Sequence, residues 1–328
     1  MALIVAMALF AGCTSNNGDQ TSTPIPPDGS ENPGVPDQAG SSTVYITRDI
    51  SPAGLMAIYE ALGRTPSGNV AVKVHTGEGE NSFHLRPDFI KELVQRVNGT
   101  IVETNTAYGG RRSSTAYHLQ VAADRGYTAI ASVDIMDGNG AITIPIVGGR
   151  RLTTNQVGAS FPRYDFYVIL SHFKGHAQGG FGGALKNMAI GLASSEGKSL
   201  IHTGGTETTG FGWFTPSNVL TESMAEAAKS VYDYLGNGER LLYINVMNNI
   251  SVDCDCNANP ARPDMHDIGI LASLDPVALD QACLDLIYAA PDSASVRARI
   301  ESRQGVHILE HAAAIGFGNR QYNLVPID

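Results

Sequence analysis

From residue 43 onward, the spacing of apolar residues alternates between two patterns. Short apolar runs rich in β-branched residues, typical of strands, are separated by segments whose apolar residues follow helical spacing. In one such segment, RPDFIKELVQRV (86–97), Pro87 suits a first helical turn. The repeated order of strand and helix predicts a parallel sheet with helices on its faces. The pairs are 43–48 and 52–62, 69–75 and 86–97, and 100–105 and 113–124, with YTAIASV (127–133) as a further strand.

The second half of the chain adds a hairpin and a central strand. The alternation of AITIPI (141–146) and RRLTTNQVG (150–158) predicts a β-hairpin. The apolar run YDFYVILSH (164–172) predicts a buried strand. Thr215-Pro216 marks the start of a helix that ends before Gly236. Strands at 241–249 and 267–273 and a helix at 275–290, with Asp275 as its N-cap, complete the pattern. The predicted fold is α/β, a mainly parallel sheet flanked by helices with a small β-hairpin excursion, in one domain over 43–328.

The N-terminus differs in composition from this domain. Residues 1–13, MALIVAMALFAGC, are apolar, too few to span a bilayer, and end in small residues, as in a secretory signal. The end of this segment resembles a bacterial lipobox, in which Cys13 would be lipidated and would hold the mature protein at the membrane of the cell envelope. The alternative is a buried N-terminal strand. Residues 14–42, rich in Ser, Thr, Asn, Gly and Pro, are predicted to be a disordered linker.

The charge balance bears on the kind of partner. The 328 residues carry a formal net charge of −10. Nucleic-acid binding depends on clustered Lys and Arg, so no nucleic acid is expected as a partner. The 43% of apolar residues is enough to fill the core of one large domain.

Polar and titratable residues follow four of the predicted strands, at the point where each ends. Ligands of open α/β sheets bind beyond the carboxyl ends of the strands, so these residues are expected to meet at one edge. They lie in 73–78, 105–112, 172–176 and 253–256. Within them we assign four residues to substrate binding, since they offer a cation or a hydrogen bond to an anionic group. These are Lys73, Asn105, Tyr108 and Arg111, the last with Arg112 beside it.

Cys254 and Cys256 are two residues apart, so in extended backbone both sulfurs face one side, with Cα atoms about 6.6 Å apart. Three states are open to them: ligation of a metal ion or iron–sulfur cluster, a disulfide within the pair or from one of them to Cys283, or free thiols. Cys283 lies on the apolar face of a predicted helix and is expected to be a buried thiol.

The segment HFKGHAQGGFGGALKN (172–187) supplies histidines and lysines among five glycines. The glycines favour a loop. His172 and His176, together with His202 further on, are candidate metal ligands beside the cysteines. Lys174, Lys186 and Lys198 predict a positive pocket for an anion, with Lys174, Lys186 and Asn187 as candidate catalytic residues. The run lacks the Lys-Ser/Thr ending of a P-loop, and neither GxSxG nor HExxH occurs, so ATP and the familiar hydrolase chemistries are not predicted.

These motifs together resemble a bacterial and archaeal family known as domain of unknown function three-six-two. The resemblance rests on VKVHTGE, ETNTAYGGRR, SHFKGHAQGGFGGALKN and CDCNANP with DIGILASLDPVALDQA, and covers nearly all of 43–328. It implies the fold and the place of the site. Some members carry a ferredoxin module, but this chain has no CxxCxxCxxxC run, so the ferredoxin role does not transfer.

The sequence therefore leads to one main hypothesis and two alternatives. The main one is an extracytoplasmic lipoprotein with a metal centre, iron or zinc, or an iron–sulfur cluster, beside a pocket for a small anionic substrate, acting by redox or metal-assisted catalysis. The second is a non-catalytic lipoprotein that binds a ligand or a metal. The third makes the cysteines a structural disulfide and the pocket free of metal.

Overall fold

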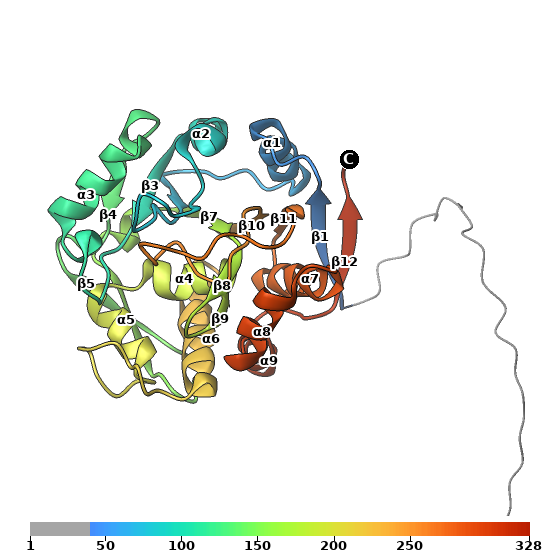
Figure 1. Cartoon of the computed structure of the whole chain (residues 1–328). Coiled ribbons are helices and arrows are strands. Elements are labelled where there is room, and N and C mark those ends of the chain that lie inside the picture. The colour runs from blue at the N-terminus through green and yellow to red at the C-terminus, as the bar shows by residue number, and fades with distance from the viewer. Residues whose placement is uncertain (1–39) are drawn as a thin grey trace, which may run out of the picture. The chain divides into compact units, whose positions relative to one another are not determined.

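Eight strands form one mixed sheet in the computed structural model, which describes residues 40–328 (Figure 1). The order across the sheet is β12-β1-β11-β10-β7-β2-β3-β4. Neighbouring strands are parallel except at the two pairings of β11, which runs against the others. The strands are β1 (Ser42–Thr47), β2 (Val70–Lys73), β3 (Gly99–Glu103), β4 (Val133–Ile135), β7 (Phe166–His172), β10 (Leu241–Met247), β11 (Gly269–Ser273) and β12 (Tyr322–Pro326). The predicted α/β fold with a mainly parallel sheet is confirmed.

Helices cover both faces of this sheet (Figure 1). On one face lie α1 (Pro52–Ala61), α2 (Pro87–Arg96) and α3 (Thr115–Asp124). On the other lie α4 (Ala184–Leu192), α5 (Ser195–His202), α6 (Ser217–Tyr234), α7 (Pro276–Ala289), α8 (Ala294–Ser302) and α9 (His307–Ala314). The central strand β7 shows why two layers are needed. Its side chains alternate between the two cores, with Val168 and Leu170 in one and Tyr167 and Ile169 in the other.

The strand order reverses between β2 and β7. From β2 the chain adds β3 and β4 on one side, and then crosses to β7 and β10 on the other. In register, Ile169 of β7 pairs with Lys73 of β2 and with Tyr243 of β10, so the carboxyl ends of these parallel strands reach the same edge. Such a reversal leaves a crevice at the strand ends, where ligands of open α/β sheets bind.

Two short hairpins stand outside the main sheet. The predicted hairpin is confirmed as β5 (Ala141–Pro145) paired with β6 (Thr154–Gly158). The glycine-rich segment, in contrast, is not the predicted loop, because β8 (Lys174–His176) and β9 (Gly180–Gly182) pair within it. A Cβ at Gly175 would lie 2.4 Å from the carbonyl oxygen of Val252. The glycine is needed for this close backbone approach, which local sequence patterns do not reveal.

Three other element predictions need correction or completion. The run 127–133 is not a strand, because Tyr127 to Ala129 form a 3₁₀ turn and β4 starts only at Val133. The buried Tyr127 hydroxyl donates to the Leu85 carbonyl, which draws this residue into the core instead of the sheet. Helix α6 begins one residue later than predicted, with Pro216 as N-cap and no side-chain cap. Helices α4, α5, α8 and α9 and strand β12 were not predicted.

The signal peptide predicted over 1–13, with Cys13, lies outside the described residues, as do residues 14–39 of the predicted linker. Within residues 40–328, no helix combines the length and the apolar character needed to cross a membrane.

Candidate functional site

A cavity opens at the carboxyl ends of β2 and β7, where the strand order reverses. Lys73 and His75 line it from the end of β2, Ser171 and His172 from the end of β7, and Cys256 from the loop after β10. Its volume is about 80 Å³. One water needs about 10–15 Å³ of such space, so the cavity suits a molecule of few heavy atoms. We call it the central cavity.

The central cavity gathers most of the lysines of the chain. Of six lysines in the sequence, four line it, namely Lys73, Lys174, Lys186 and Lys198, and Arg112 adds a fifth cation. Glu103 is the one carboxylate on the lining among the described residues. A chain with a net charge of −10 thus builds a strongly cationic cavity.

Glu103 is the shared counter-ion of one side of the cavity. Its carboxylate lies 2.9 Å from Lys73 Nζ and 3.5 Å from an Arg112 guanidinium nitrogen, and it accepts a 2.9 Å hydrogen bond from the Thr76 N–H. His118 Nε2 is 3.9 Å away. Burial by itself raises the pKa of Glu103, but Lys73 and the other neighbouring cations hold that pKa well below its ordinary value.

Two ammonium groups of the cavity have no carboxylate partner. Lys198 is hydrogen-bonded to the Thr104 hydroxyl and to the Ala193 carbonyl, 2.7 Å away. Lys186 forms no hydrogen bond or ion pair with any residue between 40 and 328. Burial, together with the repulsion of neighbouring cations, lowers the pKa of each lysine to about 7. A negatively charged ligand would relieve this repulsion.

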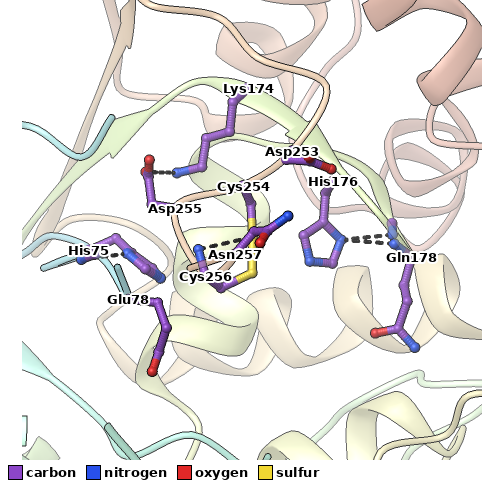
Figure 2. Close-up of a disulfide and its surroundings, with 12 residues drawn as sticks. His75, Glu78, Lys174, His176, Gln178, Asp253, Cys254, Asp255, Cys256 and Asn257 are labelled. Atoms are coloured by element: carbon purple, nitrogen blue, oxygen red, sulfur yellow. Dashed lines mark hydrogen bonds and ion pairs between the residues drawn. A yellow bond between two sulfur atoms is a disulfide. The ribbon is translucent and has the colours of Figure 1, made fainter. Parts of the chain in front are cut away.

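Between the two cysteines in the sequence stands Asp255, whose side chain points toward Lys174 (Figure 2). Cys254 and Cys256 are joined by a disulfide, and Cys256 is on the cavity lining while Cys254 is buried. Asp255 Oδ2 lies 2.8 Å from Lys174 Nζ and 3.0 Å from His172 Nδ1. Burial raises the pKa of Asp255, but the charges of Lys174 and His172 and the hydrogen bond to His172 together outweigh it and hold that pKa well below its ordinary value. The ion pair fixes the cysteine loop against β7 and β8.

His176 faces the cysteines (Figure 2). One of its ring nitrogens and the two sulfurs all lie within 4.8 Å of one another, so His176, Cys254 and Cys256 form a group that could hold a metal ion. Nδ1 of His176 accepts hydrogen bonds from the backbone N–H groups of Gly179, at 2.9 Å, and Gln178, at 3.4 Å. In a neutral ring this places the proton on Nε2. Burial keeps the ring neutral, because it lowers the pKa of His176 well below its ordinary value.

The other two histidines predicted as ligands line the same cavity but have different surroundings. Both ring nitrogens of His172 have protein partners, Asp255 at Nδ1 and the Asn248 carbonyl, 2.6 Å away, at Nε2. His202 hydrogen-bonds through Nδ1 to the Lys198 carbonyl and stacks on Phe211, with ring centroids 4.4 Å apart. The described part of the chain therefore places His176, and neither of these two, in the three-residue group with the cysteines.

The predicted substrate and catalytic residues divide into those at the cavity and those outside it. Lys73, Lys174, Lys186, Asn187 and Tyr108 line it. The Asn187 amide nitrogen is used to tie α4 to the strand ends, donating to the Leu170 carbonyl and the Ser171 hydroxyl.

Arg111 and Asn105 do not reach the central cavity. Arg111 is exposed and pairs with Asp124 at 2.7 Å. Asn105 is not on the lining, and its amide nitrogen donates to the Thr115 hydroxyl. The arginine that lines the cavity is Arg112, which is buried and bound to Glu78, Glu103 and the Tyr108 hydroxyl.

Sequence reasoning missed two residues of the site, Glu103 and Phe211. His75 and Asp255 were expected at this edge, within 73–78 and 253–256, but were given no individual role. Glu103 lies inside the predicted strand 100–105, where a charged residue directly after apolar ones carried a signal. Phe211 comes from a long connection with no regular pattern.

The glycines of 172–187 make room for the charged groups. A Cβ at Gly182 would lie 3.5 Å from Lys186 Cδ and 3.8 Å from Lys174 Cε, which is ordinary contact. A Cβ at Gly183 would lie 2.3 Å from Asp280 Oδ1. Asp280 is buried and accepts the N–H groups of Ala184 and Leu185, so it caps α4 and positions Lys186.

This difference between neighbouring glycines gives a prediction. Gly183→Ala is expected to lower the free energy of unfolding by about 1–3 kcal/mol, because the new methyl group forces the Asp280 carboxylate away from the helix. Gly182→Ala, the matched control, is expected to change it by less than about 0.5 kcal/mol. Urea unfolding of both variants measures the difference. Equal effects would contradict the close contact with Asp280.

These features define an α/β protein with a cation-lined cavity at the point where the strand order reverses. The chain belongs to the family described as domain of unknown function (DUF362), which it matches over residues 70–285. The search of curated proteins found no match.

Two solved structures are similar to this chain. The lactate racemase apoprotein from Thermoanaerobacterium thermosaccharolyticum is 12% identical, with a TM-score of 0.43, over 77% of this chain and 58% of that one. A protein from Thermotoga maritima is 12% identical, with a TM-score of 0.40, over 71% of this chain and 57% of that one. The chain thus spans less than two thirds of the length of both.

Proposed function

We propose that this protein is an enzyme that binds a small anionic substrate in the central cavity and acts on it by redox or metal-assisted chemistry. One observation carries the proposal: five cations line a cavity that has a single carboxylate on its lining. Three of the cations are matched by Glu103, Asp255 and Glu78. The ammonium groups of Lys186 and Lys198 are not, so the cavity has an excess of positive charge that a carboxylate or phosphate would neutralise.

Binding of simple anions tests this proposal. Calorimetry with propanoate and inorganic phosphate is expected to show binding of at least one of them. In Lys198→Met and Lys186→Met the affinity is expected to fall about ten- to a hundredfold, the effect of losing one charge-assisted hydrogen bond. Lys91→Met, which removes a lysine exposed on α2, is the matched control and is expected to bind as the unmodified protein does. Unchanged affinity in both cavity variants would contradict the proposal.

A metal centre is a second proposal, favoured by the distance of 4.8 Å or less among the ligand atoms of His176, Cys254 and Cys256. Thiolate and imidazole ligands suit zinc or iron, and cysteine thiolates can also hold an iron–sulfur cluster. The disulfide offers no thiolate, so the pair must be reduced before it can bind metal. His176 must also free a lone pair, either by losing the proton of Nε2 or by giving up the hydrogen bonds that Nδ1 accepts from Gln178 and Gly179. A bound metal would supply Lewis-acid or redox chemistry beside the anion.

We also propose that the protein is a lipoprotein of the cell envelope, anchored to the membrane through Cys13. The support is the lipobox-like end of the apolar segment 1–13 and the polar composition of 14–42. The alternative, a non-catalytic lipoprotein that only binds a ligand or metal, predicts binding in the central cavity without turnover. Product formation from any bound anion separates the two.

A further inference from the structure

Lys186 differs from the other lysines of the central cavity in having no partner. Lys73 is paired with Glu103, Lys174 with Asp255, and Lys198 donates to Thr104 and Ala193. Lys186 makes no such contact with residues 40–328, although it lines the cavity and is only partly exposed. Its three N–H donors are therefore left to a ligand or solvent in the cavity, which suggests a role that needs this nitrogen free.

The rest of the Lys186 side chain is well positioned. The residue lies in the first turn of α4, which is capped by Asp280 and tied to β7 through Asn187. Its Cδ lies over Gly182, next to the Lys174 stem, since both would touch a Cβ at that glycine. The amine therefore enters the cavity on a fixed helix turn and not on a mobile loop.

The surroundings favour the neutral, nucleophilic amine. Burial is the largest effect, and the positive charges of Lys174, Lys73, Arg112 and Lys198 add to it, so the pKa of Lys186 is about 7. The neutral amine is therefore more populated at neutral pH than in an ordinary lysine. A neutral lysine amine in a cationic site is the usual nucleophile for carbonyl carbons.

We propose that Lys186 is a catalytic nucleophile that forms an imine with a small 2-oxo acid. This rests on the proposed function, because the neighbouring cations hold the carboxylate while the amine attacks the adjacent carbonyl carbon. The C–N bond forms as the C=O bond breaks. The carbonyl oxygen leaves as water with both hydrogens of the neutral amine, which gives the imine, and no oxidant or reductant is consumed. A volume of about 80 Å³ fits a substrate of this size.

Reductive trapping tests the inference. The full chain is incubated with pyruvate and sodium borohydride, which reduces an imine to a stable secondary amine, and the adduct is located by peptide mass spectrometry. We expect a single adduct on Lys186. Lys186→Arg should lose it entirely, while Lys91→Arg, which alters an exposed lysine, should form it to the same extent as the unmodified protein. Acetone, which has the carbonyl but no carboxylate, should give at least tenfold less adduct.

The same samples separate this inference from the proposed function. Propanoate, a carboxylate without the carbonyl, should still bind Lys186→Arg, because the positive charge is retained. If propanoate binds the unmodified protein but pyruvate gives no adduct, or gives equal adducts on Lys91 and Lys186, the imine is wrong and anion binding stands. If propanoate and phosphate both fail to bind and no adduct forms, both proposals are wrong.

Discussion

Glu103→Gln is expected to lower the free energy of unfolding by about 3–5 kcal/mol, the cost of removing one partner from a buried ion pair. The carboxylate and its partner Lys73 are almost completely buried, with side chains 3% and 1% exposed. The Glu103 carboxylate also pairs with the Arg112 guanidinium and accepts a hydrogen bond from the Thr76 N–H. A glutamine of the same shape leaves two buried cations without their shared counter-ion. Urea unfolding at neutral pH measures the loss.

The control for this prediction is an exposed ion pair. Glu60→Gln removes a carboxylate that lies 3.5 Å from Arg96, with both side chains more than half exposed. Such pairs contribute about 0–1 kcal/mol, so this variant should unfold almost as the unmodified protein does. A loss in Glu103→Gln no larger than that of Glu60→Gln would show that Glu103 is not the counter-ion that the distances indicate.

The pH dependence provides an independent readout for Glu103. Because its pKa in the folded protein is well below the ordinary value of 4.5, the folded state favours the ionised carboxylate. The resulting stability is present above the pKa of the unfolded chain and is lost as pH falls below it. The unmodified protein should therefore lose stability on acidification below about pH 4.5 more steeply than Glu103→Gln. If the free energy of unfolding fell equally steeply with pH in the two proteins, this assignment of the Glu103 pKa would be wrong.

The positions of the central strands and of most candidate site residues could be predicted from the sequence, because they follow from the topology of parallel sheets. Runs such as 164–172 identify buried strands, and the carboxyl ends of parallel strands meet at one edge. His172, Lys174 and the cysteine pair were therefore expected to lie together, and they do, at one cavity. Three of the four clustered lysines, Lys174, Lys186 and Lys198, were also predicted to share one pocket, since lysine is rare elsewhere in the chain.

The rest depended on contacts that no local pattern encodes. Arg111 and Arg112 are adjacent and chemically identical, and the short 3₁₀ helix at 111–113 decides that Arg112 points into the protein while Arg111 pairs with Asp124. Gly175 and Gly183 have no side chain and so leave room for Val252 and Asp280 to approach the backbone closely. Both of these neighbours are far away in sequence. The direction in which a side chain leaves a turn, and the packing between segments distant in sequence, depend on the whole fold. Local sequence patterns therefore do not predict them.

Reduction of the cysteine pair is expected to create a metal site that is absent from the oxidised protein. The proposed ligands are the thiolates of Cys254 and Cys256 with His176, all within 4.8 Å of one another. The Cys256 N–H donates to the Cys254 sulfur at 3.2 Å, and the nearby ammonium of Lys174 adds positive charge, both of which favour thiolates. After reduction without oxygen, the protein should bind about one zinc ion per chain, measured by elemental analysis after dialysis.

Variants of the cysteines decide whether this site exists. The double variant Cys254→Ser, Cys256→Ser should bind no zinc, whereas Cys283→Ala, which removes the buried thiol of α7, should bind it normally. Iodoacetamide applied to the denatured, unreduced protein should leave the peptide with Cys254 and Cys256 unmodified, and should label it twice after reduction. Labelling before reduction would show that the disulfide is absent. Zinc retained by the double variant, or never bound by the reduced protein, would show that the sulfurs are not ligands.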